Sequence, residues 1–319
     1  MIHFIFISPD AFEKLGNQFG EKDGLGDLRE LLFPRRADPN VLLADPHATN
    51  WFTEVTRRAM KLPPQTRGNA LALLQRLSNQ SLVGWASPGP APANEGEWVR
   101  IACKSKGGCL DWAFTSRIDL CGESIETVDR ISDDTWLKKQ FPWSKNVPRC
   151  RTAQRPIFQK LFMGADWCIA ELPFIKGGSD DEVVTFKQLI DVISDLPRTK
   201  AFELDLVTKL EDKPAYWAGN VEDELRQTLK KRSAVKIRVF ALSKYIDRYF
   251  TVGKNVTIAK GQSKREVRRC IAVQHVAIGG NRKAESNNWN LCNSVDTSLR
   301  YEKLQVDMAV PGALVFELP

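Results

Sequence analysis

Short β-rich segments alternate with helical patterns along the first half of the chain, and this alternation constrains the fold more than any other sequence feature. HFIFIS (3–8) and NVLLAD (40–45) are apolar runs that each end where aspartate and proline mark a turn. The segments 48–61 and 67–79 have apolar residues at the spacing of amphipathic helices. Strands that alternate with helices form parallel sheets, so we predict an α/β domain.

The rest of the first half is assigned in the same way. Residues 81–88 and 98–103 are predicted as strands, and 110–121 as a helix. The Pro- and Gly-rich segment 89–97 is predicted as a surface loop, and 126–141 as a strand that leads into a helix.

The alternation restarts after a polar, basic segment that contains three prolines, 142–156. A chain of 319 residues has the length for two domains. We therefore predict two α/β domains, a mostly parallel one at 1–145 and a second one at 157–319. Residues 146–156 are predicted to be the linker between them.

Positive charge is concentrated in the second half of the chain. Residues 1–150 carry 19 Lys and Arg against 18 Asp and Glu, whereas 151–319 carry 27 against 21. Within 226–283 there are 16 basic residues and two acidic ones. Such an excess creates a positive field that attracts phosphates or anionic lipid headgroups. The alternative is a solvated, lysine-rich surface without a ligand.

The seven cysteines include no Cys-x-x-Cys pair, and their odd number favours free thiols in a reducing compartment. The apolar run at the N-terminus is too short for a membrane span and has no basic residue before it. These observations predict a cytoplasmic location. The alternative to free thiols is that Cys103 and Cys109 form half of a zinc site.

Four segments of the second half occur in a characteristic order: IAELPFIK (169–176), FELDLVT (202–208), VKIRVFALSKYIDRYFTVGKNVTIAKG (235–261) and SLRYEKLQVDM (298–308). Together they resemble the phospholipase-D-like C-terminal domain that follows MIT modules and occurs in related prokaryotic proteins. The resemblance covers roughly 155–310, and it implies that 298–308 is a late strand. In that family the first segment reads acid-x-Pro-aromatic-Ile-basic, which is matched here by Glu171, Pro173, Phe174, Ile175 and Lys176.

The catalytic motif of that family is absent here. Its later His-Asp-Arg motif falls on Ile246, Asp247 and Arg248, and no His-x-Lys occurs in the chain. The resemblance therefore implies a domain that binds phosphates without breaking bonds, and Trp289 is a candidate for stacking on a base. The cations expected to bind nucleic acid are Arg248, Lys254, Lys260, Lys264, Arg265, Arg268 and Arg269.

Acidic residues of the first half follow an order that resembles the PIN-like nucleases. The matching positions are Asp10, Glu54, Asp111 and Asp134, with Asp133 as a further metal ligand. The usual acid at the end of the first strand is replaced by Ser8, two residues before Asp10. The resemblance implies that these acids hold Mg²⁺ or Mn²⁺ and catalyse phosphodiester hydrolysis. The alternative is that they are helix caps and turn residues.

Taken together, the two resemblances imply a metal-dependent nuclease-type effector, such as one of a prokaryotic antiviral defence system. Its second domain would hold nucleic acid, DNA or RNA, or another protein of the same system. One alternative is a non-enzymatic protein that binds nucleic acid or an anionic membrane. Another is an enzyme of a different type that acts on a phosphate-bearing substrate.

Overall fold

The computed structural model of the chain has two compact units, and each is considered by itself. The N-terminal unit consists of Ile2–Trp143 and a short later segment that begins at Val256, and the C-terminal unit consists mainly of Ser144–Asn255 and Lys264–Pro319. The residues that the structure describes are 2–18, 23–33, 41–45, 50–80, 82–84, 92–104, 110–142, 144–163, 165–172, 180–196, 201–209, 222–223, 225–229, 235–243, 248–257, 264–273, 286–292 and 294–318.

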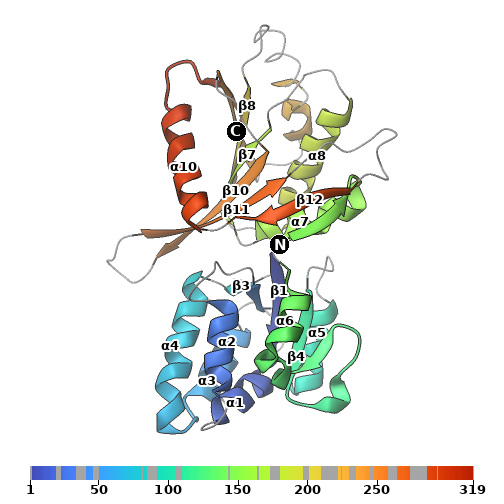
Figure 1. Cartoon of the computed structure of the whole chain (residues 1–319), viewed down its shortest axis with the longest axis vertical. Helices are drawn as coiled ribbons and strands as arrows, with labels where there is room; N and C mark the ends of the chain where they lie inside the picture. The colour runs from blue at the N-terminus through green and yellow to red at the C-terminus, as the bar shows by residue number, and fades with distance from the viewer. Residues whose placement is uncertain are drawn as a thin grey trace. The chain divides into compact units, whose positions relative to one another are not determined.

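The N-terminal unit is built on a parallel sheet (Figure 1). Its elements are, in chain order, β1 (His3–Ile7), α1 (Pro9–Asn17), α2 (Gly24–Leu32), β2 (Val41–Asp45), α3 (Asn50–Ala59), α4 (Pro64–Gln80), β3 (Leu82–Gly84), α5 (Glu95–Lys104), β4 (Trp112–Thr115), the 3₁₀ helix η1 (Ile118–Leu120), β5 (Ile125–Thr127), the 3₁₀ helix η2 (Val128–Ser132) and α6 (Asp134–Gln140). The strand order is β3-β2-β1-β4-β5, and every neighbouring pair is parallel. The predicted α/β class is confirmed for this unit.

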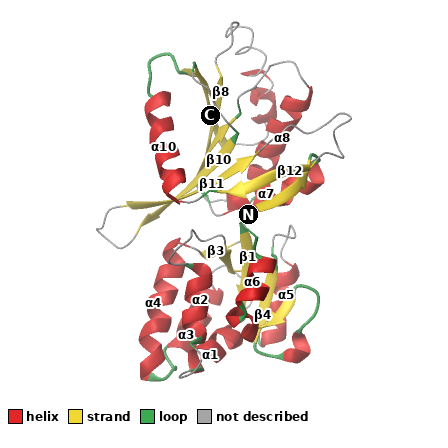
Figure 2. Cartoon of the chain, in the orientation of Figure 1, coloured by secondary structure: helices red, strands yellow, loops and turns green. Residues whose placement is uncertain are grey.

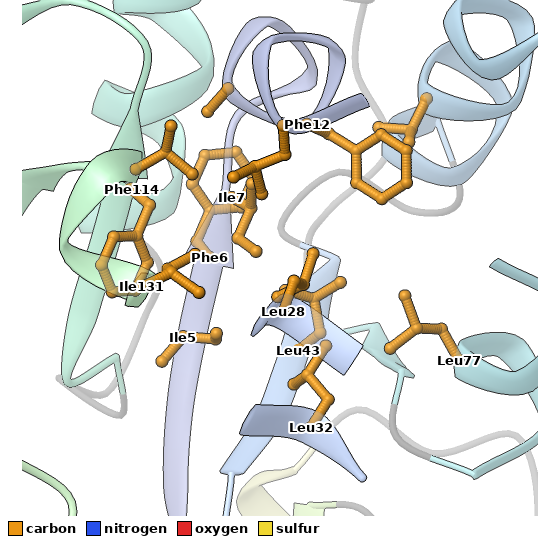
Figure 3. Packing of buried hydrophobic residues seen from close by; sticks show 14 of the residues in the cluster. Ile5, Phe6, Ile7, Phe12, Leu28, Leu32, Leu43, Leu77, Phe114 and Ile131 are labelled. Atoms are coloured by element: carbon orange, nitrogen blue, oxygen red, sulfur yellow. The ribbon is translucent and has the colours of Figure 1, made fainter. Parts of the chain in front are cut away.

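The core of this unit forms around β1, whose five residues are all buried. Burial of every residue is expected for a strand of a parallel sheet that is covered on both faces. Figure 3 shows Ile5, Phe6 and Ile7 of this strand packed among side chains of neighbouring strands and helices. Those labelled in the figure are Phe12, Leu28, Leu32, Leu43, Leu77, Phe114 and Ile131.

Two segments have the opposite structure to the one predicted. Residues 98–103 belong to α5 instead of forming a strand, and 110–121 contain β4 instead of a helix. Trp98 and Ala102 of α5 are buried four residues apart, which places them on one side of a helix. Short apolar runs such as these have no clear period, so their partners in the fold decide between helix and strand.

The C-terminal unit contains an eight-stranded mixed sheet. Its elements are β6 (Ser144–Pro148), α7 (Arg151–Met163), β7 (Trp167–Glu171), α8 (Asp180–Asp195), β8 (Phe202–Lys209), β9 (Val235–Leu242), β10 (Tyr249–Thr257), β11 (Lys264–Val273), β12 (Ser286–Leu291), α10 (Ser294–Met308) and β13 (Leu314–Leu318). The strand order is β13-β9-β8-β7-β10-β11-β12-β6. The three central strands β7, β8 and β9 are parallel, whereas β6, β10, β12 and β13 pair antiparallel with their neighbours.

Helices cover both faces of this sheet. Figure 2 shows α10 on one face and α7 with α8 on the other. The predicted linker, 146–156, instead contains the end of the edge strand β6 and the first turns of α7. The segment 298–308, predicted as a strand, lies within α10. Among the described helices, none has the length and apolar character required to cross a membrane.

Candidate functional site

The ends of β1 and β4 form the point in the N-terminal sheet where the order of the strands reverses. β2 and β3 lie on one side of β1, and β4 and β5 lie on the other. Parallel α/β sheets bind their ligands outside the carboxyl ends of the strands at such a point. Here Ser8 follows β1 directly, and its backbone N–H donates to the Phe114 carbonyl of β4 over 2.9 Å. This edge is therefore the first place to search for functional side chains.

Glu95 is the most constrained side chain at this edge. It is the first residue of α5 and is buried. Its carboxylate accepts hydrogen bonds from the hydroxyl of Ser8 and from both the backbone N–H and the hydroxyl of Ser116, the latter two over 2.6 Å. The Thr115 side chain is a fourth partner. Because a carboxylate has about four acceptor positions, the chain itself fills them all.

These donors keep Glu95 ionised. Burial alone would raise the pKa of this carboxyl group, but the hydrogen bonds from Ser116, Ser8 and Thr115 outweigh burial and lower the pKa below its ordinary value of 4.5. An ionised carboxylate at this position joins the loop after β1 to the loop after β4. We infer that Glu95 is a clamp that holds the two strand ends together.

The lowered pKa has a consequence for acid stability. A group whose folded pKa is depressed stabilises the fold above its unfolded pKa, and this contribution is lost as the pH falls through the folded value. We therefore expect the N-terminal unit to lose stability below about pH 4. The variant Glu95→Gln, already neutral, should show a weaker acid dependence in a near-ultraviolet circular dichroism titration. Equal pH dependence in this variant, the wild type and the control Glu97→Gln would contradict the clamp.

Three carboxylates beside this edge share one arginine. The Arg58 guanidinium of α3 lies 2.9 Å from both Asp10 Oδ1 and Glu13 Oε2 of α1, and 2.8 Å from Glu54 Oε1. Two hydrogen bonds from Arg57 and one from Arg58 lower the pKa of Glu54 to about 2, although partial burial opposes the shift. Glu54 is therefore held ionised by Arg57 and Arg58.

The structure brings together only two of the acids predicted to form a metal site. Asp10 and Glu54 meet at Arg58. Asp111 lies at the other edge of the sheet, where its Oδ2 accepts from the Phe4 backbone N–H over 2.8 Å. Four residues of β1 separate that point from Ser8, which corresponds to about 13 Å along a strand.

The other two predicted acids belong to the start of α6. Asp133 caps this helix, since its Oδ1 accepts from the Trp136 backbone N–H over 3.0 Å. Asp134 is the first residue of the helix and is exposed. The predicted site of Asp10, Glu54, Asp111, Asp133 and Asp134 is thus spread over two edges of the sheet. For Asp133 the structure agrees with the alternative prediction, that it is a helix cap.

The acids at the β1–β4 edge do not fit a bound Mg²⁺ or Mn²⁺ as they stand. Within the described ranges, no three His, Cys, Asp or Glu side chains are grouped in a way that could hold a metal ion. Arg58 occupies the space among Asp10, Glu13 and Glu54, and Glu95 has no acceptor position left. One feature favours a ligand at this edge: Asp10 Oδ2 is buried and has no hydrogen-bond partner among the residues that the structure describes.

The cations predicted in the second half gather on one hairpin. Lys254 lies in β10, and Arg248 immediately precedes that strand; Lys264, Arg265, Arg268 and Arg269 lie in the adjacent strand β11. The Val273 N–H donates to the Arg248 carbonyl over 2.9 Å, which joins the two strands at their base. Lys260 lies outside the described residues. Five of the seven predicted cations therefore lie on two neighbouring strands, and a sixth, Arg248, directly precedes one of them.

The outer part of this hairpin extends beyond the rest of the sheet (Figure 2). In the described register, β7 pairs with β10 only as far as Gly253, and β12 pairs with β11 at Ile271–Val273. Residues 254–257 and 264–269 therefore form a two-stranded ribbon. We call these two segments the β-ribbon. It carries five of the predicted cations, Lys254, Lys264, Arg265, Arg268 and Arg269.

At the base of the β-ribbon the cations are packed against the protein. The Arg268 guanidinium lies 3.7 Å from the centre of the Tyr301 ring, and the Trp167 ring lies beside Tyr301 at 5.2 Å. The Trp167 ring fits there because Gly253 has no side chain; a Cβ atom at Gly253 would lie 2.1 Å from it. Burial lowers the pKa of Lys254, with Asp166 acting in the opposite direction.

A second arginine is held at the carboxyl end of β7. Arg300 of α10 donates two hydrogen bonds to the buried carboxylate of Glu171, one of them over 2.6 Å, and its guanidinium lies 3.3 Å from the centre of the Tyr249 ring. Glu171 is the acid of the segment that resembles phospholipase-D-like domains. The other matching residues, Pro173, Phe174, Ile175 and Lys176, lie outside the described part of the chain, as does Asp247.

Sequence reasoning missed several of these residues. Glu95 was placed in a surface loop, although Asn94 and Glu97 have the spacing of a helix capping box; the Glu97 N–H indeed donates to Asn94 Oδ1 over 3.0 Å. Trp289, a candidate for base stacking, is fully buried against Phe158 and Phe250.

The thiol pair across β11 and β12 was also missed. Cys270 and Cys292 share a hydrogen bond between their side chains, and the Cys292 N–H donates to the Cys270 carbonyl over 2.8 Å. That bond lowers the pKa of Cys292, whereas the pKa of the buried Cys270 is raised. Cys103, half of the alternative zinc site, is an exposed residue of α5, and Cys109 lies outside the described residues.

Comparison with known proteins provides no family for this chain. Neither the models of protein families nor the curated protein sequences match it.

Proposed function

We propose that this protein binds nucleic acid through the β-ribbon formed by β10 and β11 and does not cleave it. The observation that carries the proposal is that β10 and β11 are neighbours and continue beyond their described pairing with β7 and β12, with most of the predicted cations on this two-stranded extension. Net charge supports the same function, since the chain carries +7 overall and 16 basic residues between 226 and 283.

The shape of the β-ribbon suits a nucleic acid better than a small anion. The major groove of duplex DNA admits a two-stranded antiparallel ribbon as readily as a helix. Lysine and arginine side chains on such a ribbon neutralise backbone phosphates and release counterions, which supplies affinity without sequence specificity. The packed residues at the base, Arg268 with Tyr301 and Trp167, would fix the direction in which the ribbon projects.

The test replaces the two outer cations of β11. We expect the variant K264E/R265E to bind fluorescent duplex and single-stranded oligonucleotides about tenfold or more weakly at low salt, because two phosphate contacts are lost and two repulsions are added. The slope of log K against log salt should also fall in magnitude by about 2. Fluorescence anisotropy over a salt series measures both quantities.

The matched control is K138E/K139E, which makes the same change of charge on two exposed lysines of α6. It should retain most of the affinity and the slope. Equal losses in both variants would mean that only net charge matters, and an unchanged affinity of K264E/R265E would contradict the proposal. Flotation with anionic vesicles is the companion assay: retention on vesicles without binding to oligonucleotides would favour a membrane surface instead.

Metal-dependent phosphodiester hydrolysis in the N-terminal unit is the second candidate. The unpartnered Asp10 Oδ2 at the point of strand reversal favours it. Incubation of labelled DNA and RNA with the protein and Mn²⁺ tests it directly. Cleavage that is lost in Asp10→Asn and retained in Asp111→Asn would establish this activity and overturn the binding-only proposal; intact substrate with the wild type would exclude it under those conditions.

A further inference from the structure

α10 has two faces of different character. Thr297, Leu304 and Met308 are buried, and Tyr301 packs against the same core, so one face of the helix rests on the sheet. These residues recur every three or four positions, which is the period of a helix face. The opposite face would ordinarily be polar, since a surface helix of a globular protein is amphipathic.

The outer face of α10 instead carries a stripe of large apolar side chains. Val295 is 66% exposed, Leu299 62%, Val306 69% and Val310 55%. They are spaced by four, seven and four residues, so they lie along one side of the helix. Val310 lies two residues after the end of α10, where the Ala309 N–H donates to the Gln305 carbonyl over 3.2 Å and the Val310 N–H donates to the Asp307 carbonyl over 3.4 Å. The four side chains form two exposed apolar pairs along one side of the helix, and exposed apolar surface is typical of protein contacts.

The stripe is symmetric about its centre. Leu299 and Val306 lie at equal distances in sequence from the midpoint between Glu302 and Lys303, and so do Val295 and Val310. The midpoint itself is occupied by opposite charges, Glu302 and Lys303, both exposed. A pattern that reads the same from either end, with complementary charges in the middle, matches a second copy of itself in the antiparallel direction.

We propose that the outer face of α10 binds the same face of a second copy of this chain across a two-fold axis. In a two-fold interface residue i meets residue j, and j meets i. Leu299 then packs on Val306 of the second copy, Val295 on Val310, and Glu302 pairs with Lys303 twice. A partner of another kind would need the apolar residues but not their mirror spacing.

The dimer is expected to be reversible. α10 has 15 residues and is about 23 Å long, so a contact between two such helices lies below the size of a standard stable interface. We expect a dissociation constant in the micromolar range. The contact does not depend on the β-ribbon or on nucleic acid.

Sedimentation velocity of the full chain, freed of nucleic acid and run over a series from about 1 to 100 µM, tests the proposal. The wild type should shift from monomer to dimer over this series. The variant L299E/V306E should weaken association at least tenfold, since four carboxylates would face one another. The control M60E/I118E, which changes two exposed apolar residues of the N-terminal unit, should dimerise as the wild type does. Circular dichroism confirms that each variant is folded.

Charge exchange at the centre identifies the second copy as the partner and fixes the antiparallel direction. E302K alone places lysine against lysine, and K303E alone places glutamate against glutamate, so each should dimerise several-fold more weakly than the wild type at low salt. A mixture of the two, and the double variant E302K/K303E, restore opposite charges and should recover association. A monomeric wild type at 100 µM, a control as weak as L299E/V306E, or a mixture that does not recover, would each overturn the proposal.

Discussion

The variant Arg300→Ala is expected to reduce the free energy of unfolding of the C-terminal unit by about 3–5 kcal/mol. Its guanidinium donates two hydrogen bonds to Glu171, whose side chain is only 2% exposed, and it also stacks on Tyr249. Without Arg300 the carboxylate stays buried and loses its cation, which costs more than the ion pair contributes. The loss of stability should be largest where β7 contacts α10.

Native-state hydrogen exchange, followed by mass spectrometry, measures this effect, because a protein of two units need not unfold in one step. Peptides from β7 and α10 should lose protection in Arg300→Ala. The control is Arg151→Ala, whose arginine is 54% exposed and pairs with Asp191 over 2.8 Å; an exposed pair contributes about 0–1 kcal/mol. The double variant E171L/R300L should be more stable than Arg300→Ala, since no buried charge remains. Equal protection in Arg300→Ala and Arg151→Ala would refute the argument.

Removal of the clamp, Glu95→Ala, is expected to destabilise the N-terminal unit by about 3 kcal/mol. Hydrogen bonds to a charged group each contribute about 1.5–3 kcal/mol, and Glu95 receives several of them from Ser8 and Ser116. The hydroxyl groups can turn toward other acceptors, but the backbone N–H of Ser116 cannot. The loss should therefore be smaller than the sum of the individual bonds.

Glu97→Ala is the matched control for the clamp. Both acids lie in the first turn of α5, so each change removes one negative charge from the same helix end. Among the described residues, Glu97 accepts one exposed bond, from the Ala93 N–H over 2.7 Å, and its loss should cost well under 1 kcal/mol. Exchange protection of β1 and β4 reports the difference. If the two variants lose protection equally, Glu95 acts through the helix end and not as a clamp.

The strands and helices with a clear period were predictable from sequence. β1 and β2 are short apolar runs that end at turn residues, and both formed where expected. α3 and α4 have regular apolar spacing, and they too match the predicted segments closely. In these elements the local apolar pattern agrees with the burial in the folded unit. The local sequence is therefore sufficient to predict the type of element.

The predicted metal site depended on one assignment that local sequence could not provide. Asp111 was expected within a helix, the segment 110–121, whereas it precedes β4 and accepts a hydrogen bond from the Phe4 N–H at the other edge of the sheet. The segment 98–103 was predicted as a strand but is helical, and 110–121 was predicted as a helix but contains a strand. Glu95 lies at the carboxyl edge because it is the first residue of α5, and Asp111 lies at the other edge because it directly precedes β4.

The sequence by itself determined the two α/β units, the concentration of positive charge in the second one and the residues that carry it. Only the tertiary structure decided which of those residues meet. Strand register placed the cations on one ribbon, the pairing of β1 with β4 brought Ser8 and Ser116 to Glu95, and the packing of α10 left its apolar stripe outside. The physical reason is that composition and period depend on neighbouring residues, whereas register and burial depend on contacts between residues far apart in the chain.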